Sequence, residues 1–375
     1  MTTLAPAWRD RQARLLDGLT ASGALVPGWR PSFTAVPRHA FLPEQVWRHD
    51  PGGHTPVHRD RDPDTWWDLA YADAPVVTQL DDGAENGPGM ATSSASMPSM
   101  VARMLAALEV DDMEGRVLEI GTGTGWNAAL LAHRVGDRRV ATVEIDPVLA
   151  EQAQDALLAV GRAPLVVCED GMAGYPQGGP YDRVIATCSV ARVPWAWVEQ
   201  TAPGGRIVVP LHRDVWAGGL IALTVGGNGQ AAVGRWIGEA WFMPARADRL
   251  SPAPVDSATG RSSATGLDPA RLVTPGFGAY AYARLPDVTL THAAEGGGQR
   301  VWLTGRDGSA ATAAGAPNDR EFEVWQYGPD NLWDRAEAAW TEYLSQGCPP
   351  LENFGLTVTP DRQQVWLRTP GNVIG

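Results

Sequence analysis

The chain has 375 residues, of which 44% are hydrophobic, and its formal net charge is −13 at pH 7. This charge argues against nucleic acid as a partner, because binding to phosphate depends on Lys and Arg. No apolar run approaches the ~20 residues of a membrane helix, no secretory signal opens the chain, and three cysteines are too few for a disulfide framework. We therefore expect a cytoplasmic protein without a membrane partner, long enough for two domains.

The first 110 residues mix helical and strand-like patterns. Residues 6–22 carry apolar side chains at helical spacing, which predicts a helix. The segment 45–64 is rich in His and Asp but lacks the spacing of a zinc or calcium site, so we expect a solvated loop and no metal. A strand is expected over 75–79. Four hydroxyl residues at 92–96 and a proline at 98 open a helix, and these hydroxyls either cap that helix or line a site.

The rest of the chain is organised around a glycine-rich turn at 121–125, Gly-Thr-Gly-Thr-Gly, between a strand-like and a helical run. Glycines let the backbone pass close under a ligand, and a helix N-terminus favours an electronegative group. The dinucleotide fingerprint Gly-x-Gly-x-x-Gly fails, because its third glycine falls on Trp126. The turn and the acidic residue before it instead resemble the first motif of class I methyltransferases that use S-adenosylmethionine, in which the turn lies under the methionine part of the cofactor.

Strands and helices alternate from 115 to 225, as in a doubly wound sheet. Strands are expected at 116–120, 140–145, 165–168, 181–187, 206–209, 220–225 and 238–243, and helices at 127–135 and 147–160. Glu144 ends the second strand, where an acidic residue can accept both ribose hydroxyls of an adenosyl group. Asp146 precedes Pro147 and is expected to cap the next helix. Asp170 follows the third strand, where a carboxylate can accept a hydrogen bond from the adenine amino group.

After residue 245 a passage rich in Ser, Ala, Gly and Pro leads into a second region. Residues 330–346 have helical spacing and a terminating glycine, and two alternating runs around 354–358 and 365–367 predict a hairpin with one buried side. We therefore expect a domain at 1–245 and an accessory domain at 246–375, for which peptide binding is one candidate role. Tryptophans concentrate in the second domain and form either its core or a peptide-binding surface: Trp302, Trp325, Trp333, Trp340 and Trp366.

Together these features resemble the protein-L-isoaspartate (D-aspartate) O-methyltransferase family over roughly residues 10–245. The resemblance rests on VPRHAFLPE at 36–44, YAD at 71–73, SMPSMVARM at 96–104, the glycine turn and PGG at 203–205. It implies an α/β class I methyltransferase fold, Rossmann-like and doubly wound, with a smaller α+β C-terminal domain. It also implies S-adenosylmethionine as the cofactor, bound by Glu119, Gly121, Thr122, Gly123, Glu144, Ile145, Asp170 and Gly171.

The family's Thr-Ile-Ser-x-Pro segment lines the place where the carboxylate and the methyl group meet. Ser96 falls on its serine, so the implied catalytic residues are Ser96, Ser94 and Ser93. The acceptor carboxylate is already ionised at neutral pH, and the reaction therefore needs alignment rather than a general base. The sequence departs from the family where Ser94 and Ala95 replace threonine and isoleucine, and where Trp-Asn at 126–127 replaces Tyr-Gln.

The C-terminal extension resembles that of variants in actinobacterial clusters for ribosomally made, modified peptides (lanthipeptides, lasso peptides and graspetides). Those enzymes methylate an aspartate of a constrained precursor peptide, and the ester closes to an aspartimide that can hydrolyse to isoaspartate. The resemblance implies a macrocyclised precursor peptide as the partner of a monomeric enzyme. Alternatives are general isoaspartate repair, a non-catalytic peptide-binding scaffold, and methylation of a small-molecule carboxylate.

Overall fold

The computed structural model describes residues 7–50, 52–110, 114–212, 218–249, 254–316 and 319–375. The chain divides into two compact units: unit 1 is Met1–Thr187 with Ala196–Val208, and unit 2 is Cys188–Trp195 with Val209–Gly375. The main division thus falls at 208/209 rather than at the expected 245/246. The reason is that β11 (Ala232–Glu239) pairs along β17 (Phe354–Val358), which joins it to the end of the chain.

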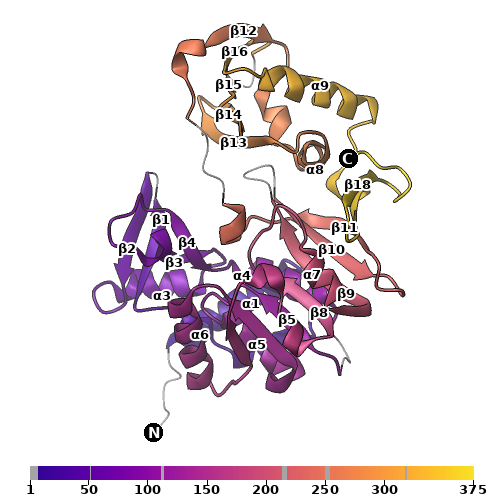
Figure 1. Cartoon of the computed structure of the whole chain (residues 1–375). Helices are drawn as coiled ribbons and strands as arrows, with labels where there is room; N and C mark the ends of the chain where they lie inside the picture. Colours follow the sequence, from indigo (N-terminus) through magenta and orange to yellow (C-terminus); the bar gives the residue numbers. More distant parts are fainter. Residues whose placement is uncertain (1–6, 51, 111–113, 213–217, 250–253, 317–318) are drawn as a thin grey trace. The chain divides into compact units, whose positions relative to one another are not determined.

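Unit 1 is built on a parallel sheet with strand order β9-β8-β5-β6-β7. Every residue of the two central strands is buried, as expected for a parallel sheet covered on both faces. The predicted doubly wound fold is therefore confirmed (Figure 1). The strands are β5 (Val117–Ile120), β6 (Val140–Glu144), β7 (Leu165–Cys168), β8 (Tyr181–Ala186) and β9 (Thr201–Leu211). The helices that accompany them are α4 (Pro98–Leu108), α5 (Trp126–Val135), α6 (Pro147–Ala159) and α7 (Trp195–Glu199).

A smaller antiparallel sheet with strand order β2-β1-β3-β4 precedes this core. The expected solvated loop at 45–64 is wrong, because the chain there forms a hairpin whose Val46 and Val57 are buried against Trp66. No group of three His, Cys, Asp or Glu side chains among the described residues could hold a metal. The strands are β1 (Gln45–Asp50), β2 (Gly53–His58), β3 (Val76–Leu80) and β4 (Ala91–Ala95), and the helices are α1 (Ala7–Ala21), α2 (Arg30–Ala35) and α3 (Pro63–Tyr71).

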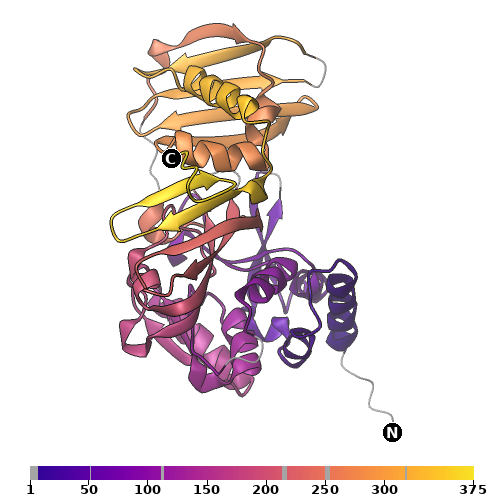
Figure 2. The same cartoon turned by 90° about the vertical axis from the view of Figure 1, so that its right-hand side faces the viewer.

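Unit 2 contains an antiparallel run of strands in the order β10-β11-β17-β18. The predicted C-terminal hairpin is confirmed as β17 and β18 (Gln363–Leu367) (Figure 2). The expected strand at 238–243 is wrong: after β10 (Gly219–Val225) a glycine-rich turn reverses the chain, so the next strand already starts at Ala232. None of the helices in the described ranges is both long and apolar enough to cross a membrane.

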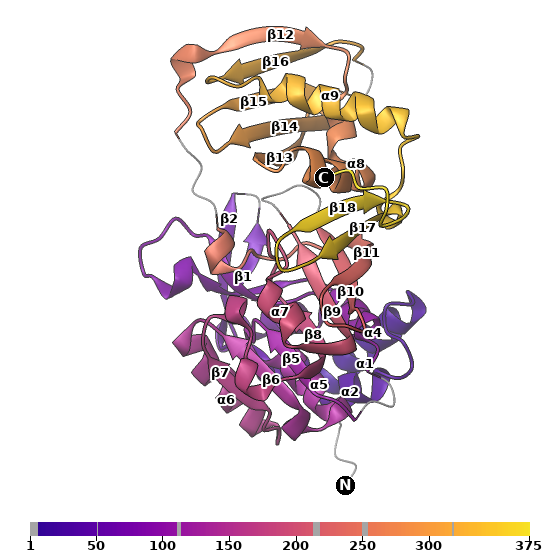
Figure 3. The ribbon, with the colours of Figure 1, turned by 45° about the vertical axis from the view of Figure 1, so that its right-hand side comes forward.

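The rest of unit 2 is a five-stranded antiparallel sheet with one face covered by α9 (Leu332–Ser345), the predicted helix (Figure 3). Trp333 and Trp366 are buried, whereas Trp302 and Trp325 lie on strands of this sheet and are 36% and 39% exposed, so the tryptophans divide between core and surface. The strands are β12 (Arg261–Thr265), β13 (Val288–Glu295), β14 (Gly298–Gly305), β15 (Ala310–Gly315) and β16 (Phe322–Tyr327). The helix α8 (Pro275–Arg284) lies between β12 and β13 in the chain.

Candidate active site

The glycine turn leads from β5 into α5 as the sequence predicts. Gly121, Gly123 and Gly125 have φ angles of 88°, 53° and 88°, in the left-handed region that disfavours other residues. A side chain on Gly125 would also place its Cβ 3.3 Å from the Cβ of Ala153 in α6. The turn is therefore fixed by backbone conformation and by close packing of two helices.

Trp126 and Asn127, which replace the family's Tyr-Gln, belong to the scaffold. The Trp126 indole is 5% exposed and donates a hydrogen bond to the carbonyl oxygen of Val36 at 3.2 Å. The Asn127 amide donates to a carboxylate oxygen of Glu119 at 2.7 Å. Both side chains thus hold the first helix of the methyltransferase core in place.

Glu144 ties the ends of two strands together. One of its carboxylate oxygens accepts the Gly123 N–H at 2.9 Å, and the other accepts the Asp146 N–H at 3.1 Å. Each oxygen keeps a further lone pair, so the group can still accept hydroxyl donors from a ligand. Asp146 caps α6 by accepting the N–H groups of Val148 and Leu149, which confirms the predicted cap.

Glu119 lies at the end of β5 with no exposed surface. Its carboxylate accepts hydrogen bonds from Asn127 and from the Thr142 hydroxyl, the latter at 2.6 Å, and Thr142 is in turn bonded to the Thr122 hydroxyl at 2.7 Å. Burial raises the pKa of Glu119 to about 7, and the charge of Glu144 adds to this rise. The carboxyl group of Glu119 therefore has a pKa near neutral pH.

Two of the three predicted serines, Ser93 and Ser94, lie beside the glycine turn. A Cβ built on Gly123 would be 3.9 Å from the Ser93 hydroxyl and 3.9 Å from the Ser94 carbonyl oxygen. Ser93 is buried and accepts a hydrogen bond from Thr78 at 3.3 Å, whereas Ser94 and Ser96 are half-buried. Within the described ranges, the hydroxyls of Ser94 and Ser96 have no hydrogen-bond partner. These two hydroxyls of the serine segment are thus available to a ligand.

The alternative that these hydroxyls cap a helix is wrong. Residues 91–95 form β4, and α4 starts only at Pro98, with Met97 as an N-cap that makes no side-chain bond. The capping acceptor is instead Asp73, whose carboxylate takes the Ser99 N–H at 2.8 Å. Asp73 belongs to the YAD segment, so that segment caps α4, the helix that follows the serines.

Arg38 is the functional residue that the sequence analysis missed. Its side chain has 0% exposure, and its Nη2 donates to the carbonyl oxygens of Ala74, Ala95 and Ser96, each at 3.0 Å. Its Nη1 donates to the carbonyls of Ala70 and Ala72, both at 3.2 Å. Arg38 therefore fixes the backbone on which Ser96 stands. The partners named here lie 32 to 58 positions further along the chain, so VPRHAFLPE alone gave no signal of this role.

The charge of Arg38 survives its burial. Desolvation lowers the pKa of Arg38 to about 10, the charge of Asp73 acts in the opposite direction, and the group stays protonated at neutral pH. The guanidinium carbon lies 5.7 Å from the centre of the Trp126 ring, within the range of a cation–π contact. One buried cation thus connects the N-terminal motif, the serine segment and the start of α5.

His39 and Tyr71, from the same two motifs, form a neutral pair. The His39 Nδ1 lies 2.5 Å from the Tyr71 hydroxyl. Burial, and next the charge of Arg59, lowers the pKa of His39 to about 4, and burial raises the pKa of Tyr71. Both groups are uncharged at neutral pH, so neither adds a charge beside the serine segment.

The third predicted motif is the most exposed. Asp170 is exposed and one of its oxygens accepts the Met172 N–H at 2.9 Å, while Ile145 is 41% exposed. The Gly171 carbonyl accepts a hydrogen bond from the Trp197 indole at 2.8 Å. A Cβ on Gly171 would lie 2.6 Å from the Cγ2 of Ile120, so glycine is required for packing there.

A parallel sheet that places a three-glycine turn and a buried acidic residue at the ends of adjacent strands defines a class I methyltransferase core. The family model described as protein-L-isoaspartate(D-aspartate) O-methyltransferase matches residues 57–223. A protein-L-isoaspartate O-methyltransferase of Ignicoccus hospitalis is 36% identical over 181 residues, covering 48% of this chain and 71% of the relative. Protein-L-isoaspartate O-methyltransferase 1 of Rhodopseudomonas palustris is 34% identical over 216 residues, covering 57% and 74%.

The chain belongs to the S-adenosylmethionine-dependent protein-L-isoaspartate O-methyltransferase family. A solved structure titled protein-L-isoaspartate O-methyltransferase matches 96% of this chain and 100% of its own with a TM-score of 0.57, at 22% identity. This likeness concerns the fold, and it extends beyond the family model into the C-terminal part of the chain.

The residues at the strand ends fit the family's cofactor. The left-handed glycines leave the turn without side chains, Glu144 keeps lone pairs for a diol, and Asp170 is exposed. Glu119 and Thr122 act through bonds within the scaffold, and their contact with the methionine part stays a prediction. The individual roles of Gly121, Ile145 and Gly171 stay predictions as well.

Proposed function

We propose that the protein esterifies a side-chain carboxylate of a peptide, and that its natural acceptor is an aspartate of a ribosomally made, modified precursor peptide. The observation that supports the reaction type is a pair of hydroxyls, Ser94 and Ser96, that have no partner among the described residues; their segment approaches the glycine turn at Ser93 and Ser94 and is held by Arg38 at Ala95 and Ser96. The hydroxyls of Ser94 and Ser96 thus offer hydrogen-bond donors for an acceptor carboxylate.

In this reaction Ser96 donates a hydrogen bond that orients the acceptor carboxylate, and Ser93 and Ser94 line the acceptor pocket. A carboxylate with a pKa near ~4 is already ionised, so no residue has to remove a proton. S-adenosylmethionine supplies an electrophilic methyl group when it is bound. The chain's own task is to align the acceptor oxygen and to exclude water.

The ester then reacts without further help from the enzyme. The backbone nitrogen of the residue after the aspartate attacks the ester carbonyl, a C–N bond forms, and methanol leaves with the N–H proton. The product is an aspartimide, whose hydrolysis gives aspartate or isoaspartate. The net change from the starting aspartate to the aspartimide is the loss of one water.

Two residues support a dedicated peptide acceptor. Ser94 and Ala95 stand where the family has threonine and isoleucine, and both are smaller. Ser94 is half-buried and Ala95 is 3% exposed on β4, so the change alters the volume around the acceptor segment rather than its backbone. We further propose a macrocyclised precursor as the partner of a monomeric enzyme in the cytoplasm, a compartment that suits its three free cysteines.

General repair of isoaspartyl proteins is the second candidate. It is supported by the names of the curated relatives and by a solved structure of that name whose fold spans 96% of this chain. In that case the acceptor is an isoaspartyl carboxylate of many unrelated sequences. The C-terminal unit would then contribute to binding proteins in general.

A mass-spectrometric assay with S-adenosylmethionine separates the two candidates. The substrates are a generic linear isoaspartyl peptide and the macrocyclised precursor peptide encoded nearest the gene, with its aspartate-to-asparagine form as a control. Gain of one methylene followed by net loss of one water, on the cyclic aspartyl peptide alone, supports the dedicated function. Turnover of the generic peptide alone assigns the protein to repair, and turnover of neither would reject both.

A further inference from the structure

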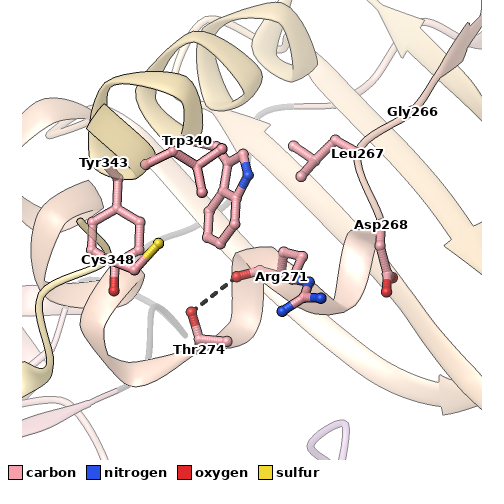
Figure 4. Close-up of a pocket in the computed structure, with 9 residues that line it drawn as sticks. Gly266, Leu267, Asp268, Arg271, Thr274, Trp340, Tyr343 and Cys348 are labelled. Atoms are coloured by element: carbon pink, nitrogen blue, oxygen red, sulfur yellow. Dashed lines mark hydrogen bonds between the residues drawn. The ribbon is translucent and has the colours of Figure 1, made fainter. Parts of the chain in front are cut away.

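Unit 2 contains a pocket of about 580 Å³ that no step of the proposed reaction uses. Its walls come from the segment before α8, from α9 and from the chain that follows α9 (Figure 4). The residues that matter for its chemistry are Leu267, Arg271, Trp340, Tyr343, Leu344 and Cys348. The pocket lies in the part of the chain beyond the match to the family model, which ends at residue 223.

Two aromatic rings give the pocket a rigid apolar wall. Trp340 is half-buried. The centre of its ring lies 5.2 Å from that of Phe277, in an edge-on contact, and 5.4 Å from that of Tyr343. The Tyr343 hydroxyl donates to the carbonyl oxygen of Pro349 at 3.0 Å, so the polar end of this ring is occupied within the fold. A ligand side chain resting on these rings would meet an apolar surface that is already ordered.

Arg271 brings a positive charge to the same pocket. Figure 4 shows the Trp340 indole directed toward Arg271 and Thr274, with Leu267 on one side and Tyr343 on the other. Arg271 is exposed, and within the described part of the chain its guanidinium has no hydrogen bond or ion pair. By contrast, Arg284, Arg300 and Arg335 of the same unit each pair with a carboxylate.

The neighbouring polar groups are already used. Asp268 also lines the pocket, but its carboxylate accepts the Ala270 N–H at 2.9 Å and thereby caps a short helix. The Thr274 hydroxyl donates to the Arg271 carbonyl at 3.0 Å. The guanidinium is therefore the unpaired cation of the pocket, and a guanidinium recognises a carboxylate through paired N–H···O bonds.

We propose that this pocket binds a peptide segment that carries a carboxylate beside an apolar side chain, with the carboxylate on Arg271 and the apolar group against Trp340. The proposal rests on the proposed function, since it assigns the segment to the peptide substrate. The protein's net charge of −13 repels acidic peptides at long range, so their binding has to depend on a local contact of this kind. Binding here raises the local concentration of substrate and acts on KM rather than kcat.

Fluorescence polarisation on the full chain tests the pocket without turnover. The probes are a fluorescein-labelled acidic peptide, Gly-Gly-Leu-Asp-Leu-Glu amide, and its isosteric form, Gly-Gly-Leu-Asn-Leu-Gln amide. We expect about tenfold or more tighter binding of the acidic probe, and loss of this preference in Arg271→Gln. Leu344→Glu, at a residue 49% exposed, should weaken the acidic probe similarly by repulsion. Arg306→Gln, at an exposed position outside the pocket, should retain the preference.

Cysteine alkylation locates the bound probe. Cys348 lines the pocket and is exposed, while Cys168 is an exposed thiol in unit 1. A saturating acidic probe should slow alkylation of Cys348 and leave Cys168 unchanged in the same sample. Equal rates with and without probe at Cys348, or equal binding of both probes, would overturn the proposal.

The outcome also separates this site from the proposed function. Binding that depends on Arg271, in an enzyme that methylates neither substrate, would reject the proposed function and retain the pocket. Methylation with a KM unchanged by Arg271→Gln would reject the pocket and retain the function. Tighter binding of a basic probe, in which Lys replaces Asp and Glu, would also reject the carboxylate assignment.

Discussion

Arg38 in unit 1 and Arg271 in unit 2 show how differently the two parts of the chain use the same side chain. Arg38 has no exposed surface and donates to backbone carbonyls of two segments that flank the candidate site. Arg271 is exposed at an open pocket, and the described residues supply no partner for it. A buried cation whose Nη1 and Nη2 donate to backbone carbonyls organises structure, whereas an unpaired, exposed cation beside an apolar wall can recognise a ligand.

Replacing Arg38 should reduce stability strongly, whereas replacing Arg271 should hardly change it. This is the largest effect we expect. Arg38→Met leaves several buried carbonyls without donors, which should lower the free energy of unfolding by about 3–5 kcal/mol. Chemical denaturation followed by circular dichroism measures this loss, and hydrogen exchange should rise at 69–74 and 95–96. Arg271→Gln is the control and should change stability by less than about 0.5 kcal/mol. Similar stability of the two variants would contradict the assigned roles.

A second prediction concerns the pH dependence of stability, because unit 1 contains the buried acid Glu119. The pKa of Glu119 is raised to about 7 from an ordinary 4.5, so the folded state favours its protonated form. The stability contributed by this group is complete below about pH 4.5 and is lost as pH rises through about 7. Glu119→Gln should remove this dependence on pH. At pH 8 the variant should avoid a loss of up to about 3 kcal/mol in the free energy of unfolding.

Glutamine can keep the hydrogen bonds of Glu119. Its oxygen accepts from Asn127, and its amide donates to the Thr142 hydroxyl, which then donates to Thr122. The measurement is urea denaturation of both proteins between pH 4.5 and pH 8. A difference in stability that is constant across this range would show that Glu119 does not titrate there.

The smallest of the three effects sharpens the comparison at the level of chemistry. Ser96→Ala removes one donor to a carboxylate and should reduce kcat about 10- to 100-fold, while cofactor affinity changes less than about twofold. Single-turnover methylation and cofactor titration measure the two quantities. Ser345→Ala, at an exposed position in α9, is the control. Equal loss of turnover and cofactor affinity would show that Ser96 supports the cofactor rather than the acceptor.

The sequence predicted those parts of unit 1 that depend on neighbours in the chain. The glycine turn, the Asp146 cap and the acidic end of β6 follow from local spacing, and all three occur as expected. The roles of Arg38 and Asp73 depend on segments 26 to 58 positions away, so no local pattern could indicate them. The hairpin at 45–58 was missed for the same reason, because its apolar side is defined by Trp66.

Unit 2 was predictable as a set of elements but not as a site. The spacing of α9 and the alternation of the C-terminal hairpin are local signals, and both elements are present. The tryptophans could not be sorted from sequence, since the burial of Trp333 on α9 and the exposure of Trp302 on β14 depend on which faces the tertiary fold covers. The pocket likewise arises where Arg271 and Trp340 meet, 69 positions apart in the chain.

The contacts of Arg38 also bear on how such an enzyme can change its substrate during evolution. Arg38 holds Ala95 and Ser96 through their main-chain oxygens alone, and every residue type carries that oxygen. Substitutions at positions 94 and 95 can therefore accumulate without loosening the anchor. A lineage can vary the shape of its acceptor site one side chain at a time, and each intermediate retains a correctly placed Ser96.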